Sequence, residues 1–217
     1  MPRARSVSNA EIPIKLSQIF TPDGVALARR QVAAKGTTRG TAFLIHGTAQ
    51  HSLNLTETMR GFARQRWNVE ATDLRGHGHS TGPRAPHAHM EIGAGWEKLV
   101  ADLTLSMQTA FEGVPWDQRL VIAPNFGSPL VLEVLKNWPD LAQQIVLIAP
   151  PPNQPVILKL ARGISRARAQ LNAEDVPDSL TMHQLYSFLG AQLSDRERLI
   201  DVMSSDRAIT DLSLIHI

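Results

Sequence analysis

Residues 123–127 are of the types that form a sharp strand-to-helix turn, in which one side chain is presented to a reacting molecule. In order, they are Ala123, Pro124, Asn125, Phe126 and Gly127. Such a turn needs small residues on both sides of its centre, because the strained backbone leaves no room for larger side chains. Ala123 and Gly127 meet that need. Asparagine tolerates a left-handed backbone, so we expect the turn to form around Asn125.

The central asparagine changes the chemistry that this turn can perform. An amide side chain is not deprotonated by a histidine near pH 7 and accepts no acyl group, whereas a serine hydroxyl would do both. We do not expect Ser128 to take over, because its flanking residues Phe126 and Leu130 are not small. Hydrolysis of Asn125 to aspartate would create a carboxylate nucleophile, although Asn-Phe is not a pair prone to deamidation.

Two further turns carry residues of interest. His46, Gly47 and Thr48 follow the apolar run 42–45, and we expect Gly47 to turn the chain sharply off a buried strand. A loop after the next strand contains Arg75, Gly76, His77 and Gly78. Its glycines permit a tight backbone, and we expect Arg75 and His77 to brace neighbouring loops.

The elements that position these turns alternate between strands and helices. Short, wholly apolar runs predict strands buried on both faces, which are typical of a parallel sheet. The predicted strands are 42–45, 68–73, 120–123 and 145–149, after a hairpin of 14–20 and 25–31. The predicted helices are 53–65, 93–112 and 130–137. The pattern indicates an α/β fold with a mostly parallel sheet and helices on both of its faces.

The chain divides into three segments by composition. Residues 1–150 form the α/β core, residues 151–211 show only helical patterns typical of a lid, and residues 212–217 are an apolar tail unrelated to either. We expect the strands that would follow the lid to be absent, through truncation or in a naturally short protein. Strand 145–149 would then be an open, apolar edge, through which the chain could associate with itself.

The three turn segments together resemble the α/β-hydrolase superfamily. They are TAFLIHGTAQHS from Thr41, ATDLRGHGHSTGP from Ala71 and LVIAPNFGSPL from Leu120. Within the superfamily, the chain is most similar to the monoacylglycerol lipase and lysophospholipase group, also described as serine aminopeptidase-like hydrolases. The resemblance covers about residues 14–149. It implies a serine carboxylic-ester hydrolase acting on monoacylglycerol or lysophospholipid-type substrates, with no cofactor.

The resemblance also implies roles for particular residues. The backbone N–H groups of Thr48 and Phe126 would form the oxyanion hole, which stabilises the tetrahedral intermediate of acyl transfer. Asn125 stands where the family has its nucleophilic serine. The family's catalytic acid and histidine follow on later loops, and none of the remaining candidates is expected to replace them: Asp201, Asp206, Asp211, His183 and His216.

These departures leave three interpretations open. The first is a hydrolase fragment that is inactive as written, with an error or a private variant at position 125. In the second, the chain is an inactive hydrolase-fold protein that binds a ligand or acts as a scaffold, with the Asn125 amide bonding the ligand. In the third, the chain has no function because it does not fold stably alone.

Composition excludes several other classes. The 217 residues include no cysteine, so disulfides and thiolate sites are absent, and the formal net charge is only +2. No aromatic and basic platform for nucleic acid appears, and no apolar run approaches the roughly 18 residues of a membrane span. Basic residues at 159–168 allow at most peripheral membrane contact. Four histidines at 77–89 lack a carboxylate at ligand spacing, so we expect no metal. We expect a cytoplasmic protein whose partner is a small lipid ester or other acyl ligand.

Overall fold

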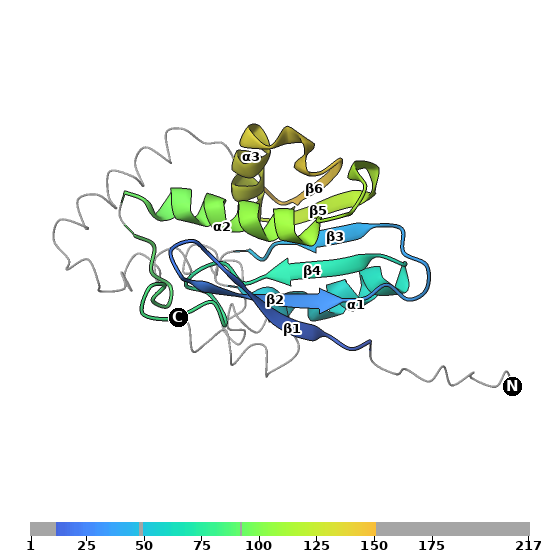
Figure 1. Ribbon diagram of the computed structural model, residues 1–217, viewed down its shortest axis with the longest axis horizontal. Helices are drawn as coiled ribbons and strands as arrows, with labels where there is room; N and C mark the ends of the chain where they lie inside the picture. Colours follow the sequence, from blue (N-terminus) through green and yellow to red (C-terminus); the bar gives the residue numbers. More distant parts are fainter. Residues whose placement is uncertain (1–11, 48–49, 92, 151–217) are drawn as a thin grey trace, which may run out of the picture.

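A six-stranded sheet forms the centre of the computed structural model, which describes residues 12–47, 50–91 and 93–150 (Figure 1). The strand order is β1-β2-β4-β3-β5-β6. The strands are β1 (Lys15–Phe20), β2 (Ala26–Val32), β3 (Thr41–Leu44), β4 (Asn68–Thr72), β5 (Arg119–Pro124) and β6 (Gln144–Ile148). β4, β3, β5 and β6 are parallel, and β1 and β2 add an antiparallel edge. The mostly parallel sheet is therefore confirmed.

The antiparallel edge is the hairpin that the sequence predicts. Its turn is closed by Thr21, whose hydroxyl accepts the Val25 N–H at 2.9 Å. Gly24 has a φ of +80°, a backbone conformation that favours glycine. The register pairs Phe20 with Ala26 next to the turn. A proline, an aspartate and a glycine in sequence therefore identified the turn correctly.

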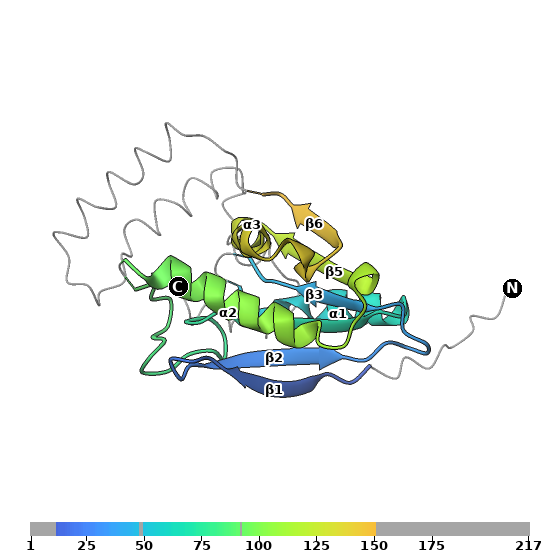
Figure 2. The same ribbon diagram turned by 45° about the horizontal axis from the view of Figure 1, so that its top comes forward.

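Helices cover both faces of the sheet, as expected. α1 (Thr56–Arg64) lies on one face, and α2 (Gly95–Ala110) and α3 (Gly127–Asn137) lie on the other (Figures 1 and 2). Successive residues of β3 point to opposite faces. Phe43 accordingly packs with the α2 and α3 side chains, whereas Ala42 and Leu44 pack with those of α1.

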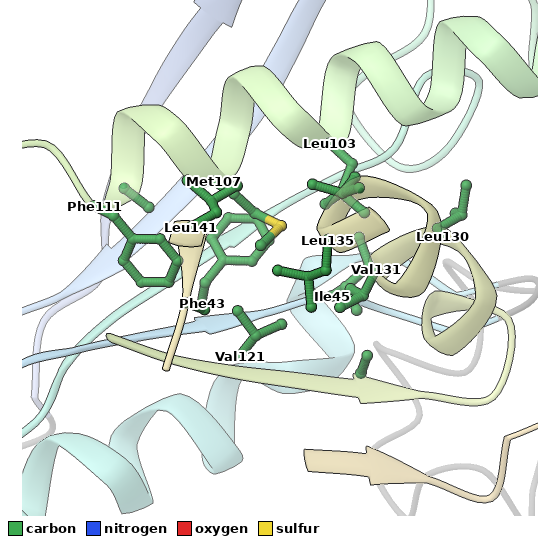
Figure 3. Close-up of a cluster of buried hydrophobic side chains, with 14 of the residues drawn as sticks. Phe43, Ile45, Leu103, Met107, Phe111, Val121, Leu130, Val131, Leu135 and Leu141 are labelled. Carbon is green, nitrogen blue, oxygen red and sulfur yellow. The ribbon is translucent and has the colours of Figure 1, made fainter. Parts of the chain in front are cut away.

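The largest of the three clusters of buried apolar side chains lies between the sheet and the α2–α3 pair (Figure 3). α2 and the residue that caps it contribute Leu103, Met107 and Phe111 at four-residue spacing, which places them on one side of the helix. The rings of Phe43 and Phe111 meet edge to face, with centroids 6.4 Å apart. Truncation of a buried phenylalanine such as Phe43 to alanine costs about 3–5 kcal/mol. This core therefore fixes β3 and β5 beneath the two helices.

All three helices begin at residues that differ from the sequence prediction, and α2 begins at Gly95 instead of residue 93. The segment predicted as one helix from residue 53 begins as a 3-10 turn at Ser52–Leu55 and becomes α1 at Thr56. α3 begins at Gly127, three residues before the predicted start, because the turn at Asn125 leads directly into the helix. Two further 3-10 turns, Trp116–Gln118 and Pro139–Leu141, precede β5 and β6.

β6 forms one edge of the sheet within the described residues. Its side chains are unusually exposed for an apolar strand: Ile145 by 42%, Val146 by 45% and Ile148 by 50%. The predicted lid at 151–211 and tail at 212–217 lie outside the described residues, as would any later strand, so these stay predictions. No helix in the described part of the chain is long and apolar enough to span a membrane.

Candidate active site

Asn125 occupies the apex of the turn between β5 and α3. Its φ is +48°, the left-handed conformation expected there, and its side chain is exposed. The amide makes no hydrogen bond to any residue that the structure describes. The small residue at position 127 has a steric reason, because a Cβ built at Gly127 would lie 2.5 Å from Ile45 Cγ2 and 3.2 Å from the His46 carbonyl oxygen. The Asn125 side chain is thus exposed to solvent, on a turn in which position 127 has no room for a side chain larger than that of glycine.

Backbone hydrogen bonds hold this turn in place. The Asn125 N–H donates to the Ile148 carbonyl oxygen of β6 at 2.8 Å, and the Ser128 N–H donates to the Asn125 carbonyl oxygen at 3.0 Å. The Phe126 N–H, the donor that the resemblance assigns to an oxyanion hole, makes no hydrogen bond within the described residues. The donor therefore has its hydrogen-bonding capacity available at the first turn of α3.

Ser128 is in no position to act as a nucleophile. Its side chain is fully buried, and its hydroxyl donates a 2.8 Å hydrogen bond to the Ala123 carbonyl oxygen. This bond ties the end of β5 to the start of α3. The serine is therefore part of the support for the turn.

The turn after β3 lies directly beside Asn125. A Cβ built at Gly47 would be 3.5 Å from Asn125 Cβ and 2.9 Å from the side-chain oxygen of Gln50. That same Gln50 oxygen accepts the Gly47 N–H at 3.0 Å. Thr48 lies outside the described residues, so its oxyanion role stays a prediction.

His46 is a buried support of this turn. Its Nε2 accepts the Leu74 N–H at 3.0 Å, so the ring proton is on Nδ1, which donates to the Gly47 carbonyl oxygen at 2.9 Å. Burial and the neighbouring His77 ring, 5.2 Å away between centroids, lower the pKa of His46 to about 4. A neutral ring therefore connects β3 to the loop after β4.

Asp73 joins three segments around the two turns. Its carboxylate accepts the N–H groups of Ser52, at 2.6 Å, and His79, at 2.9 Å, and also the Ser52 hydroxyl. Arg30 of β2 forms an ion pair with it at 3.3 Å, and both side chains are buried. Burial raises the pKa of Asp73, but the hydrogen bonds outweigh that effect and hold it below its ordinary value. A carboxylate is the form that accepts all of these bonds.

Arg75 and His77 brace neighbouring loops, as their sequence context suggests. Arg75 donates to Asp102 of α2 at 2.6 and 2.8 Å and to Asp23 of the β1–β2 turn at 2.9 and 3.2 Å. The bonds from Arg75 and Thr21 lower the pKa of Asp23 to about 2. His77 packs on His46, and its Nδ1 lies 3.0 Å from the Arg75 carbonyl oxygen.

Gly76 and Gly78 permit the tight loop that these contacts require. Both have positive φ, of +74° and +50°. A Cβ at Gly78 would overlap with the Asp73 carboxylate. The backbone conformation therefore requires glycine at both positions, and at Gly78 the buried carboxylate also leaves no room for a side chain.

The arrangement can be compared with known proteins. A family model described as serine aminopeptidase, S33 (Hydrolase_4), matches residues 36–212. The chain belongs to this S33 hydrolase family. An uncharacterized abhydrolase domain-containing protein of Dictyostelium discoideum is 28% identical over 152 residues, which are 68% of this chain and 15% of that protein.

Solved structures share the fold of this S33 family member. A thermostable carboxyl esterase from Bacillus coagulans, solved with glycerol, superposes with a TM-score of 0.72 at 15% identity, over 94% of this chain and 66% of that one. The thioesterase domain of the curacin biosynthetic pathway superposes with a TM-score of 0.54 at 16% identity, over 94% of this chain and 66% of that domain. The chain thus spans 66% of these structures and 15% of the curated relative.

The candidates that the sequence offers for a catalytic acid and histidine lie outside the described residues. The positions weighed from the sequence, Asp201, Asp206, Asp211, His183 and His216, all lie outside them. Within residues 12–47, 50–91 and 93–150, no group of three or more potential metal ligands gathers, and His77, His79, His87 and His89 form no such cluster. The described part of the chain therefore contains the turn at residues 123–127, called the elbow from here on, and the side chains that support it.

Sequence reasoning missed the polar network that centres on Asp73. Arg30 and Ser52 belong to segments that gave no catalytic signal, and both are buried. The sequence did place a charged residue at each of two predicted strands, because Arg30 lies in β2 and Asp73 directly follows β4. A buried charge requires a partner, but the partner's identity depends on which strands are neighbours.

Proposed function

We propose that this S33 hydrolase binds a carboxylic-ester or other acyl ligand at the Asn125 turn without forming an acyl-enzyme. The observation that carries the proposal is the exposed Asn125 amide at a left-handed apex, beside Gly47 and followed by the unoccupied Phe126 N–H. These groups offer hydrogen bonds to an ester carbonyl. No hydroxyl is available at the apex for acyl transfer, and Ser128 is buried.

Monoacylglycerol and lysophospholipid-type esters are the ligands that we propose. They follow from the resemblance of the motifs at 41–52, 71–83 and 120–130, and the cytoplasmic location belongs to the same proposal. The family membership supports a site for acyl compounds but leaves the head group and chain length to experiment.

Calorimetric titration with 1-monooctanoylglycerol tests the proposal directly. We expect saturable binding by the unaltered chain, no release of octanoate above the uncatalysed rate, and no labelling of residues 119–137 by a fluorophosphonate. Asn125→Ser would place a hydroxyl at the apex, and labelling there at least tenfold above that of Asn125→Ala would show that a base in this chain activates the hydroxyl. Octanoate release by the unaltered chain, or an absence of binding, would contradict the proposal.

Ester hydrolysis is the second candidate, and the preserved turn geometry favours it. The close packing at Gly127 would serve serine as well as asparagine. Serine and asparagine codons can differ by one base, so reading the codon for position 125 in the source genome tests this candidate. A serine codon would make hydrolysis the expected activity only together with a catalytic acid and histidine, because a serine hydroxyl needs a base to activate it.

A further inference from the structure

A cavity of about 360 Å³ lies next to the elbow at the carboxyl edge of the sheet. Its walls come from the loop 75–91, the first turns of α2 and Phe126. Figure 1 shows this loop and the start of α2 beyond the arrowheads of β3 and β4, the edge at which open α/β sheets bind ligands. The Phe126 ring packs edge-on against Trp96, with centroids 6.2 Å apart. A ligand in the cavity would therefore touch the residue that follows Asn125.

The cavity has an apolar wall and a charged rim. The apolar wall consists of Pro83, Ala85, Pro86, Ala88, Met90 and Leu99. Such a surface suits the hydrocarbon part of a ligand, and the few polar groups around it set the ligand's orientation. The identity of those polar groups then decides which end group the ligand carries.

Arg84 is the rim cation that remains available. Arg75 is already bonded to two aspartates, and Lys98 forms an ion pair with Glu91. Arg84 makes no ion pair or hydrogen bond with any residue in the described part of the chain. Two histidines, His77 and His89, complete the polar lining, and burial lowers the pKa of His77, which is therefore neutral at pH 7.

The β1–β2 turn positions the Arg84 guanidinium. A Cβ built at Gly24 would overlap with Arg84 Nη1 and lie 3.3 Å from its Cζ. The guanidinium therefore lies against the Gly24 backbone, in space that only a glycine leaves open. A planar guanidinium in this position can bond both oxygens of a carboxylate or phosphate.

We infer that this cavity binds an amphiphile with a carboxylate or phosphate group, its apolar part against the cavity wall and its anionic group on Arg84. The inference rests on the proposed acyl-ligand function and adds a charge requirement to it. The anionic end of the ligand would lie at the rim, while its chain reaches Phe126 and the elbow.

Trp96 provides a local signal, because its indole contacts the Phe126 ring that lines the cavity. Titrations followed by tryptophan emission would compare octanoate, octyl phosphate, octanol and inorganic phosphate, with Trp96→Phe identifying the part of the change that belongs to this residue. We expect octanoate and octyl phosphate to bind about tenfold more tightly than octanol. Inorganic phosphate alone should bind more weakly than octyl phosphate, since it lacks the apolar part.

Two matched pairs of variants test the role of Arg84. Arg84→Gln should remove the tenfold preference for octanoate, whereas Arg64→Gln, which alters an exposed arginine of α1, should keep it. Gly24→Ala should displace the guanidinium and lower the preference. Gly36→Ala imposes the same left-handed strain at a φ of +91° with no atom within 4 Å, and should leave the preference unchanged.

The outcomes separate this inference from the function on which it rests. Equal binding of octanol and octanoate, or an unchanged preference in Arg84→Gln, would overturn the anionic subsite while monooctanoylglycerol binding stands. Tighter binding of inorganic phosphate than of octyl phosphate would overturn the amphiphile and leave a free-anion site. A lack of any Trp96 response to the four compounds would also overturn the inference, and the calorimetric titration would then report separately on the acyl site.

Discussion

Asp73 accepts the main-chain N–H of Ser52 at 2.6 Å, and this bond joins the end of β4 to the chain that follows the Gly47 turn. The same carboxylate is paired with Arg30 of β2, whose side chain is only 4% exposed. The strands and turns around the elbow therefore depend on one buried charge. Removal of one partner of such a pair leaves the other charge uncompensated, which costs more than a surface ion pair contributes.

Asp73→Asn should lower the free energy of unfolding by about 3–5 kcal/mol, because Arg30 would remain buried without its counter-charge. Urea unfolding at pH 7 measures the change. Glu57→Gln removes an acidic side chain that is 72% exposed and pairs with Arg60, and should change stability by less than about 1 kcal/mol. A value for Asp73→Asn close to that of the control would show that Asp73 does not hold the network together.

The contrast between the elbow and the Asp73 network shows what the sequence could predict. The elbow was predictable because its residues are consecutive, and each position has a local steric reason. The strands β3, β4 and β5 were predictable because their apolar runs are short and continuous. The network was not, because Arg30 and Asp73 are distant in sequence and meet only when β2 pairs with β4.

Helix boundaries also depend on contacts between segments that are distant in sequence. The pattern from residue 130 onward identified α3, but its start at Gly127 depends on how closely the turn packs on Ile45. That contact joins β3 to α3, and no pattern within either segment contains it. Thr48 and the residues after 150 lie outside the described part of the chain. The oxyanion role of Thr48 and the lid at 151–211 therefore stay predictions.

Gly127→Ala should destabilise the protein by about 1–3 kcal/mol, because the added methyl group would lie 2.5 Å from Ile45 Cγ2. Gly61→Ala is the matched control, since Gly61 is also helical and a Cβ there would meet no atom within 4 Å. It should stabilise the protein by about 0.5–1 kcal/mol through helix propensity. Thermal unfolding of both variants gives the comparison, and equal changes in the two would refute the steric explanation.

Acid should destabilise the fold through His46. Its pKa of about 4 in the folded chain lies below the ordinary value of 6.5, so the unfolded chain binds the proton more tightly. The stability contributed by neutral His46 is complete above pH 6.5 and is lost as the pH falls toward 4. The loss amounts to about 3 kcal/mol, at about 1.4 kcal/mol per pKa unit.

Urea unfolding at pH 7.5, 5.5 and 4.5 measures this loss, and His46→Gln provides the reference. Glutamine does not titrate in this range, so the variant should show a smaller decrease between pH 6.5 and 4. Burial lowers the pKa of His77 as well, and the decrease that persists in His46→Gln includes its contribution. Identical pH profiles in the two proteins would mean that His46 does not govern the acid sensitivity.

The exposed strand β6 should mediate association between copies of this chain. Its outer edge has no strand partner within the described residues, and Ile145, Val146 and Ile148 are each exposed by more than 40%. Unpaired, apolar edge strands pair readily with other chains, and a lysine within the strand opposes that pairing. Val146→Lys should therefore shift the sedimentation profile toward monomer at concentrations where the unaltered chain associates. Leu132→Lys, at a side chain 50% exposed on α3, introduces the same charge away from the edge and should leave association unchanged.

Two outcomes would contradict pairing through β6. One is an unaltered chain that is monomeric at all concentrations, and the other is an equal decrease of association in Val146→Lys and Leu132→Lys.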